Sequence, residues 1–312
     1  MAPGRATLNA YNGAPRGHRS MSLRRYLQLD VFADRPGAGN PLAVVLDCDG
    51  LDEAAMQAIA RWSNRPETTF VFPPVDPKAG YRIRMFSPTR EVPFAGHPSV
   101  GTAYAVLDAG IAAVVDGHVW QEGLAGVLPL AVSGTGSGRT VAVRTPKARV
   151  AAVGEREAPA LAPSLRPFAP GRLPPALMEG GRRWWVAEVA NEQALRRAQP
   201  DWQAIAGLAA STDSMGLCAF ARADAGQDYD LVVRALVGSG NCFEDAASGA
   251  ANATLAAWLQ HNRAVPGREG AYVVSQGREV GFDARLSLRI DADGEVWSGG
   301  RVCTVVRGHI DW

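Results

Sequence analysis

Two glycine-led helix starts hold the residue types in this sequence that could bind and act on a small anion. In the first, Gly96 and His97 lie where a loop of small residues becomes a helix-forming run. Pro98 suits the first helical turn, because the N–H that proline lacks would have no partner there. The run that follows is apolar nearly all round, which predicts a buried helix. Its N-terminus would direct free N–H groups and the positive end of the helix dipole out of a core, which favours an anion such as a carboxylate.

A similar arrangement occurs about half a chain later. There Ser248, Gly249 and Ala250 form a small-residue turn that leads into a second apolar helix. A strand-like run precedes each helix start, at residues 81–86 and 229–236. This weak internal repeat predicts two similar lobes. If the two helix N-termini face one cleft, they can hold one small anionic molecule between them. Two ordinary buried helices with glycine entries are the simpler alternative that these residues leave open.

Composition and charge exclude several classes of partner. The 312 residues are 47% hydrophobic and 20% charged, as in ordinary soluble globular proteins, and the length predicts one or two domains. Lys plus Arg is 32 and Asp plus Glu is 31, which gives a net charge of +1. No basic stripe points to nucleic acid. Because no run of about 18 apolar residues occurs, we expect no membrane span.

The sequence offers no pattern for a metal or a nucleotide cofactor. Its histidines make no HxH or HExxH pattern, so we expect no metal site. The phosphate-binding patterns GxxxxGK[ST] and GxGxxG are also missing from strand-to-helix junctions. The four cysteines form no CxxC and no dense framework, which predicts reduced thiols in a cytosol. They are Cys48, Cys218, Cys242 and Cys303.

The first 21 residues differ from the rest of the chain. They contain arginines, glycines and prolines but no acidic residue and no apolar stretch, so they do not resemble a secretory signal. We predict a disordered arm for residues 1–21, or a start codon placed too early.

Periodicity and turn signals predict many strands and few helices, an α+β protein rather than a doubly wound α/β sheet. The predicted helices cover residues 53–62, 202–208 and about 248–260, with helical residues at 194–195 and a helix that begins near Gly96. We interpret residues 151–183 as the crossing between lobes plus a short helix. The predicted strands cover residues 25–32, 41–46, 68–72, 81–86, 184–189, 215–221, 229–236, 270–276, 285–290, 296–298 and 301–307, with β-rich residues at 114–144.

Five motifs, taken together and in order, resemble the PhzF-like isomerases, a family of phenazine-biosynthesis proteins related to diaminopimelate epimerase. They are LDVFADRPGAGNPLAVVL, NRPETTFVFPP, FSPTREVPFAGHPSVGTAYAVL, FEDAASGAANATLAAWL and GGRVCTVVRGHI. Each motif alone is modest, but the ordered set is specific, and the resemblance covers about residues 23–312.

The resemblance implies a fold of two pseudo-symmetric lobes with the site in the cleft between them. Each lobe would be a curved, barrel-like β-sheet around a central helix, which agrees with the two buried helices inferred above. In such proteins the final strand often returns to the first lobe. We therefore predict an N-terminal lobe of residues 22–145 plus about 300–312, and a C-terminal lobe of residues 146–299.

The resemblance also implies roles for individual residues. The family's general acid/base glutamate falls on Glu67, its site histidine on His97 and its site aspartate on Asp245. We expect a raised pKa for Glu67, from lost hydration in a cleft beside Phe70 or Phe72. Simpler roles stay open: Glu67 as a solvated residue, and His97 or Asp245 as helix caps. The substrate-binding positions implied are Gly96, Pro98, Ser248, Gly249 and Ala250.

The second-lobe motif departs from the family pattern EDP-x-TGSA. Ala246 replaces the proline, Ser248 replaces the threonine and keeps a hydroxyl, and Ala250 replaces a serine. That serine helps to hold the substrate carboxylate in the phenazine enzymes, so its loss argues for a different substrate. Phe282 also stands where an arginine is common.

Three functional hypotheses follow. The first is a cofactor-independent isomerase that moves a proton and a double bond within a small unsaturated or cyclic carboxylic acid. The second is a diaminopimelate-type epimerase or racemase, which would use two thiols; Ala95 and Ser248 occupy those positions here. The third is a non-catalytic ligand-binding relative, against which the presence of Glu67 argues. The resemblance further implies a homodimer in natural-product metabolism such as antibiotic biosynthesis, and the cysteine pattern predicts a cytoplasmic protein.

Overall fold

The structure is a computed structural model that describes residues 22–154 and 158–312, so the arm predicted at 1–21 lies outside the described residues. The helices are α1 (Glu53–Ser63), α2 (Gly96–Asp108), α3 (Leu161–Leu165), α4 (Glu192–Arg197), α5 (Trp202–Thr212) and α6 (Gly249–His261). The strands are β1 (Leu23–Val31), β2 (Asn40–Val45), β3 (Glu67–Phe72), β4 (Tyr81–Phe86), β5 (Glu91–Val92), β6 (His118–Gly123), β7 (Gly126–Ser133), β8 (Thr140–Arg144), β9 (Arg149–Val153), β10 (Ala176–Gly180), β11 (Arg182–Glu188), β12 (Gly216–Arg222), β13 (Leu231–Val237), β14 (Phe243–Asp245), β15 (Ala271–Gln276), β16 (Ala284–Ile290) and β17 (Val296–Asp311).

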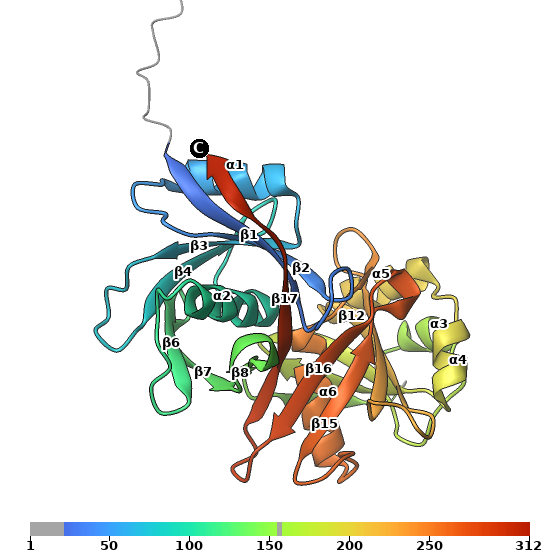
Figure 1. Cartoon of the computed structure of the whole chain (residues 1–312). Coiled ribbons are helices and arrows are strands. Elements are labelled where there is room, and N and C mark those ends of the chain that lie inside the picture. The colour runs from blue at the N-terminus through green and yellow to red at the C-terminus, as the bar shows by residue number, and fades with distance from the viewer. Residues whose placement is uncertain (1–21, 155–157) are drawn as a thin grey trace, which may run out of the picture.

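The first lobe is a closed barrel around α2. Its strands pair in the ring β1-β2-β3-β4-β6-β7-β8-β17, and β17 pairs with β1 to close it. Helix α2 lies inside this barrel, and β17 runs past it toward the second lobe (Figure 1). Strands surround this helix, so most of its residues are buried, as its nearly all-apolar sequence predicts. Helix α1 covers the outer face, where Met56 and Ile59 pack against Phe70.

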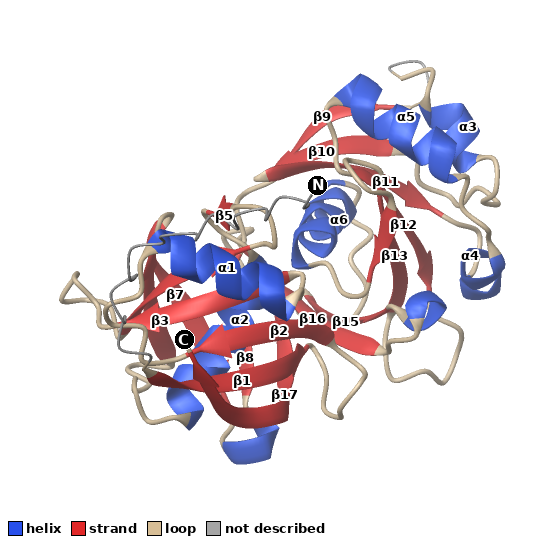
Figure 2. Cartoon of the chain, turned by 90° about the horizontal axis from the view of Figure 1, so that it is seen from above, coloured by secondary structure: helices blue, strands red, loops and turns tan. Residues whose placement is uncertain are grey.

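The second lobe repeats the design around α6. Strands β9, β10, β11, β12, β13, β15, β16 and the start of β17 follow one another around that helix (Figure 2). Helices α3 and α5 cover the outside of this sheet. Two adjacent tryptophans show the two faces: Trp184 packs in the α6 core, and Trp185 packs under the outer helices. The predicted α+β fold with two barrel-like lobes, each around one helix, is therefore confirmed.

The end of the chain differs from the prediction in one respect. Residues 296–298 and 301–307 were expected as two strands, but they belong to one strand, β17, of 16 residues. The pair Gly299 and Gly300 does not break it. A Cβ on Gly299 would lie 2.2 Å from the Val141 carbonyl oxygen, so this glycine lets β8 approach closely instead. As a result β17 belongs to both lobes, pairing with β16 at one end and with β1 at the other.

The interpretation of residues 151–183 was incomplete. The short helix is there as α3, but the strand β10 was missed, and it pairs with both β9 and β11. The prolines and glycines around β10 mask a short strand of five residues, although most of them are buried. Within the described residues, no helix is long and apolar enough to cross a membrane.

Candidate active site

Glu67 is the first residue of β3, at the edge where the first lobe faces the second. Side chains alternate along a strand, so Glu67 and Thr69 share the face that looks onto α2. The Thr69 hydroxyl lies 2.8 Å from that of Thr102 in α2, which fixes this face. Phe70 and Phe72 point to the opposite face and pack under α1. The expectation that these two rings would dehydrate Glu67 was therefore wrong.

His97 is the group that Glu67 faces. Its Nε2 lies 3.5 Å from a Glu67 carboxyl oxygen, and the side chains are only 10% and 21% exposed respectively. The His97 ring hydrogen-bonds to the backbone of Pro41, while Nε2 has no hydrogen-bond partner among the described residues. An imidazole that donates to a carbonyl through one nitrogen presents a lone pair at the other. The Nε2 lone pair thus points toward Glu67.

Asp245 comes from the second lobe but is held partly by the first. The side-chain amide of Asn40, in β2, donates to Asp245 Oδ1 at 3.1 Å and to the Ala247 carbonyl at 2.9 Å. The Ala247 N–H donates to the same Asp245 oxygen at 3.2 Å. The side-chain amide of Gln276 also donates to the backbone carbonyl of Asp245 at 2.8 Å. Asp245 is therefore fixed from both lobes.

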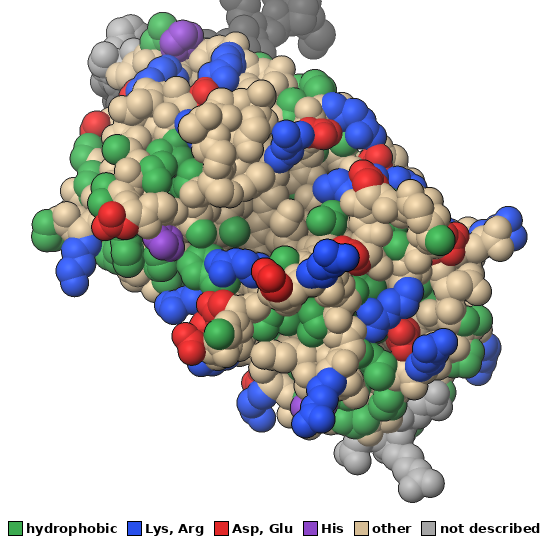
Figure 3. Space-filling view, turned by 60° about the horizontal axis from the view of Figure 1, so that its bottom comes forward, with side chains coloured by type: hydrophobic (Ala, Val, Ile, Leu, Met, Phe, Trp, Pro, Cys, Tyr) green, Lys and Arg blue, Asp and Glu red, His purple; other side chains and the backbone are tan. Residues whose placement is uncertain are grey.

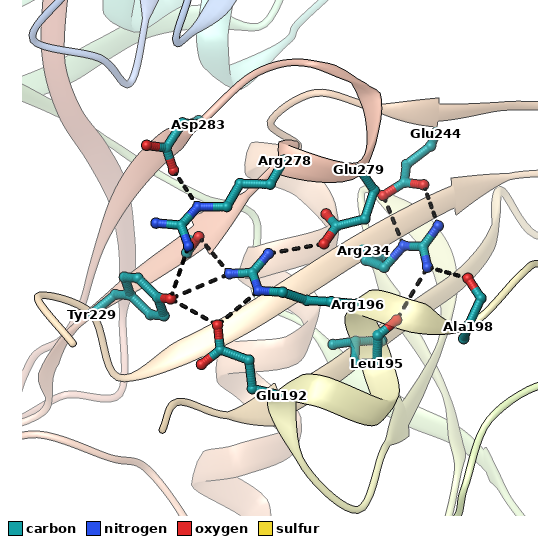
Figure 4. Close-up of polar contacts among 12 residues, drawn as sticks. Glu192, Leu195, Arg196, Ala198, Tyr229, Arg234, Glu244, Arg278, Glu279 and Asp283 are labelled. Carbon is teal, nitrogen blue, oxygen red and sulfur yellow. Dashed lines mark hydrogen bonds and ion pairs between the residues drawn. The ribbon is translucent and has the colours of Figure 1, made fainter. Parts of the chain in front are cut away.

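A buried ion pair anchors the strand that carries Asp245. Arg234 in β13 donates to both carboxyl oxygens of Glu244, at 3.0 and 2.8 Å (Figure 4). The same guanidinium donates to the carbonyls of Leu195 and Ala198, at 3.1 and 2.6 Å. The two charged side chains are 5% and 3% exposed. Such a bidentate, fully hydrogen-bonded pair fixes geometry as well as charge, and Asp245 is the next residue after it.

The N-termini of α2 and α6 meet at the junction of the lobes. A Cβ built on Gly249 would lie 3.9 Å from the Cα of Gly96. Ala95, which precedes α2, provides no side-chain cap, and the Ser248 hydroxyl caps α6 by accepting from Ala251 N–H. The other first-turn N–H groups of both helices have no partner within their helix. The structure thus brings the predicted positions at both helix starts to one place, beside Glu67 and Asp245.

The electrostatics of the three side chains differ. Burial, together with the nearby charge of Asp245, raises the pKa of Glu67 to about 7, against a partial opposing effect from Arg182. Burial lowers the pKa of His97 to about 3, which the Pro41 hydrogen bond only partly offsets. Burial also raises the pKa of Asp245, against the hydrogen bonds from Ala247, Ser248 and Asn40. A Glu67 that exchanges protons near neutrality, beside a neutral imidazole, suits general acid–base work.

Other parts of the molecule are less suited to this chemistry. In residues 22–154 and 158–312 no group of three or more His, Cys, Asp or Glu could hold a metal ion. A cavity of about 340 Å³ lies on the outside of the second lobe, lined by Leu165, Phe168 and Glu188, and shares no residue with the site. On one face of the molecule the surface is hollowed near its middle, with charged side chains around the rim (Figure 3).

Sequence reasoning missed three residues of this site. Asn40 was assigned to a turn cluster, although its amide spans the two lobes. Gln276 and Ser298 were assigned only to strands, although both lie against the start of α6. A polar side chain at an otherwise apolar position of a buried strand was the available signal, since such groups need partners.

Two barrel-like lobes that meet at paired helix N-termini, with a titratable carboxyl between them, define the class of two-lobed isomerases and epimerases. Within that class the chain belongs to the phenazine biosynthesis-like (PhzC-PhzF) family, whose model matches residues 29–308. It is 35% identical over 293 residues to an uncharacterized isomerase of Mesorhizobium japonicum, covering 90% of this chain and 95% of the relative. It is 31% identical to the trans-2,3-dihydro-3-hydroxyanthranilate isomerase of Pseudomonas aeruginosa, covering 88% of this chain and 92% of the relative.

Solved structures share the fold. The phenazine biosynthesis protein of the PhzF family from Bacillus anthracis aligns with a TM-score of 0.77 at 24% identity, covering 93% of this chain and 99% of that one. A hydroxyproline epimerase from Agrobacterium vitis aligns with a TM-score of 0.61 at 11% identity, covering 93% and 92%. The fold is therefore common to isomerases and epimerases, while the family and its named relatives place this chain among the isomerases.

Proposed function

We propose that this protein is a cofactor-independent isomerase that moves a proton, and with it a double bond, within a small unsaturated or cyclic carboxylic acid. The observation that carries the proposal is Glu67, a carboxyl group with a pKa of about 7 that faces His97 and the second lobe's Asp245. Glu67 would take a proton from one carbon of the substrate and return it to another carbon of the same π-system. No metal or organic cofactor takes part in this reaction.

The two helix N-termini would bind the substrate carboxylate and stabilise negative charge as it develops. The N–H groups of Gly96, His97, Gly249 and Ala250 would supply the donors, with Pro98 and Ser248 shaping the two helix starts. His97 Nε2 and the Asp245 carboxyl would accept hydrogen bonds from polar groups on the substrate. These roles are supported by the convergence of the two helix starts, since a Cβ built on Gly249 would lie 3.9 Å from the Cα of Gly96.

An epimerase of the two-thiol type has less support from the described residues. Cys48 and Cys218 are buried, and burial raises the pKa of each thiol to about 12. A thiol with so high a pKa is a poor base. The Cys242 sulfur contacts the Trp202 carbonyl, and Ala95 and Ser248 stand at the positions where the two thiols would be needed.

The fate of a labelled hydrogen tests the proposal. The substrate, trans-2,3-dihydro-3-hydroxyanthranilate or a related cyclic carboxylate, would carry deuterium at the carbon that loses hydrogen, in ordinary water with chelator present. Because one carboxyl acts as both base and acid, part of the deuterium should appear at the new position in the same molecule. Complete washout at early conversion, with inversion at a single carbon, would favour the epimerase. Turnover lost in chelator would contradict cofactor independence.

The pH dependence offers a second test. Glu67 must be unprotonated to remove a proton, and its pKa is raised from 4.5 to about 7. We therefore expect kcat/KM to fall as the pH drops through about 7. His97, with a pKa of about 3, should stay neutral across this range and add no second step. A midpoint near the usual glutamate value would show that the base is not this carboxyl.

We further propose that the substrate belongs to natural-product metabolism such as antibiotic biosynthesis, and that the protein acts as a cytoplasmic homodimer. Support comes from membership of the phenazine biosynthesis-like family. The change from serine to Ala250 at the start of α6 argues that the substrate differs from that of the phenazine enzymes. The mass in solution, measured by light scattering, tests the dimer.

A further inference from the structure

Ser298 is a buried serine on β17 whose hydroxyl has no partner. The residue is 2% exposed, and its Oγ makes no hydrogen bond with any residue in the described part of the chain. The position lies where β17 passes from the second lobe to the first, between pairing with Leu288 in β16 and Val143 in β8. A buried hydroxyl without a partner is energetically unfavourable, so this atom calls for an explanation.

The hydroxyl lies beside the place where the two helix starts meet. A Cβ built on Gly249 would be 3.7 Å from Ser298 Oγ and 3.9 Å from the Cα of Gly96. Strand alternation agrees with this direction. Val296, two residues earlier, packs in the core that holds both central helices, whereas Trp297 points away and its indole N–H donates to Asp291. The Ser298 side chain therefore points to the α2 and α6 starts.

The nearby side chains of Ser248 and Ala250 make no hydrogen bond with Ser298. Ser248 Oγ accepts from the Ala251 N–H as the helix cap, and its hydroxyl is hydrogen-bonded to the Asp245 carboxyl. Position 250, on the first turn of α6, has only a methyl group. Among residues 22–154 and 158–312, the unpartnered hydroxyl beside the N–H groups of α2 and α6 is therefore that of Ser298, which comes from β17.

We propose that Ser298 donates a hydrogen bond to the substrate carboxylate and takes the place of a hydroxyl that Ala250 cannot supply. This inference rests on the proposed function, because it requires a carboxylate between the two helix starts. It assigns to β17, the strand shared by both lobes, a direct part in substrate recognition. It also makes the identity of residue 298 a determinant of which carboxylates bind.

Equilibrium binding of a simple aromatic carboxylate tests the inference without turnover. The probes are anthranilate and its uncharged amide, anthranilamide, measured by calorimetry on the full chain. Ser298→Ala should weaken anthranilate binding about 10-fold, since a hydrogen bond to a charged group is lost, and should change anthranilamide binding by less than about 2-fold. Ser287→Ala, an exposed serine on the adjacent strand β16, is the matched control and should bind both probes like the parent.

A rescue variant separates recognition from a packing effect. Ala250→Ser introduces a hydroxyl at the start of α6, so the double variant Ser298→Ala/Ala250→Ser should recover most of the lost anthranilate affinity. A Ser298→Ala protein that binds anthranilate like the parent, or a double variant without recovery, would overturn the proposed hydrogen bond from Ser298. Neither result would contradict a carboxylate site between the helix starts. A parent that does not prefer anthranilate to its amide would overturn the carboxylate site itself. Isomerisation through Glu67 is measured separately, by turnover.

Discussion

The Glu67→Gln variant should turn over its substrate about 100- to 10,000-fold more slowly than the parent, which is the usual contribution of a positioned acid or base. The substitution keeps the size of the side chain and its ability to hydrogen-bond, but an amide can neither take nor return a proton. Substrate affinity should change little, because the helix starts proposed to hold the carboxylate are untouched. Single-turnover rates and binding constants, measured on the same preparation, separate the two effects.

The control for this variant is Glu53→Gln, which changes a glutamate that is 71% exposed at the start of α1. It should keep full activity. Folding of Glu67→Gln should not suffer: the raised pKa of Glu67 means that its charged form is disfavoured in the folded protein, so above about pH 7 the amide is no less stable. Activity of Glu67→Gln within threefold of the parent would remove Glu67 from the reaction.

The two central helices could be predicted from sequence because their signals are local. A long apolar run of helix-forming residues with glycine at its entry favours a buried helix, and both helices begin within one residue of the predicted start. The long strand β17 was harder to predict from the sequence. Gly299 and Gly300 favour a turn when judged by their neighbours in sequence, but here they allow β8 to approach, which depends on residues about 150 positions away.

The environment of the site depends on contacts that no local pattern contains. A raised pKa for Glu67 was expected from neighbouring phenylalanines, but its cause is the overall burial at the lobe junction and the charge of Asp245. Asp245 in turn is held by Asn40, which is 205 positions away in sequence. The motifs therefore pointed to Glu67, His97 and Asp245, while the groups that position them became visible only once the two lobes were placed together.

The buried pair Arg234–Glu244 should be the most sensitive polar interaction of the second lobe. Exposed ion pairs contribute little, but removing one member of a buried pair leaves the other charge unpaired in a medium of low dielectric. Here the two side chains are 5% and 3% exposed and joined by two hydrogen bonds. Arg234 also holds two carbonyls of the α4 end, so the pair connects that segment to β14.

The Glu244→Gln variant should therefore lose about 3–5 kcal/mol of the free energy of unfolding, measured by denaturant titration. Activity should fall with it even under conditions where the variant is folded, because Asp245 is the next residue on β14. The matched control is Glu179→Gln, which breaks the exposed pair of Glu179 with Arg149 and should change stability by less than about 1 kcal/mol.

Replacing both partners, as Arg234→Met/Glu244→Leu, should restore part of the stability but not all, since the carbonyls of Leu195 and Ala198 would lose their donor. A Glu244→Gln protein as stable as the Glu179→Gln control would show that the buried carboxylate does not balance the Arg234 charge, and that β14 is fixed by its backbone pairing with β13 instead.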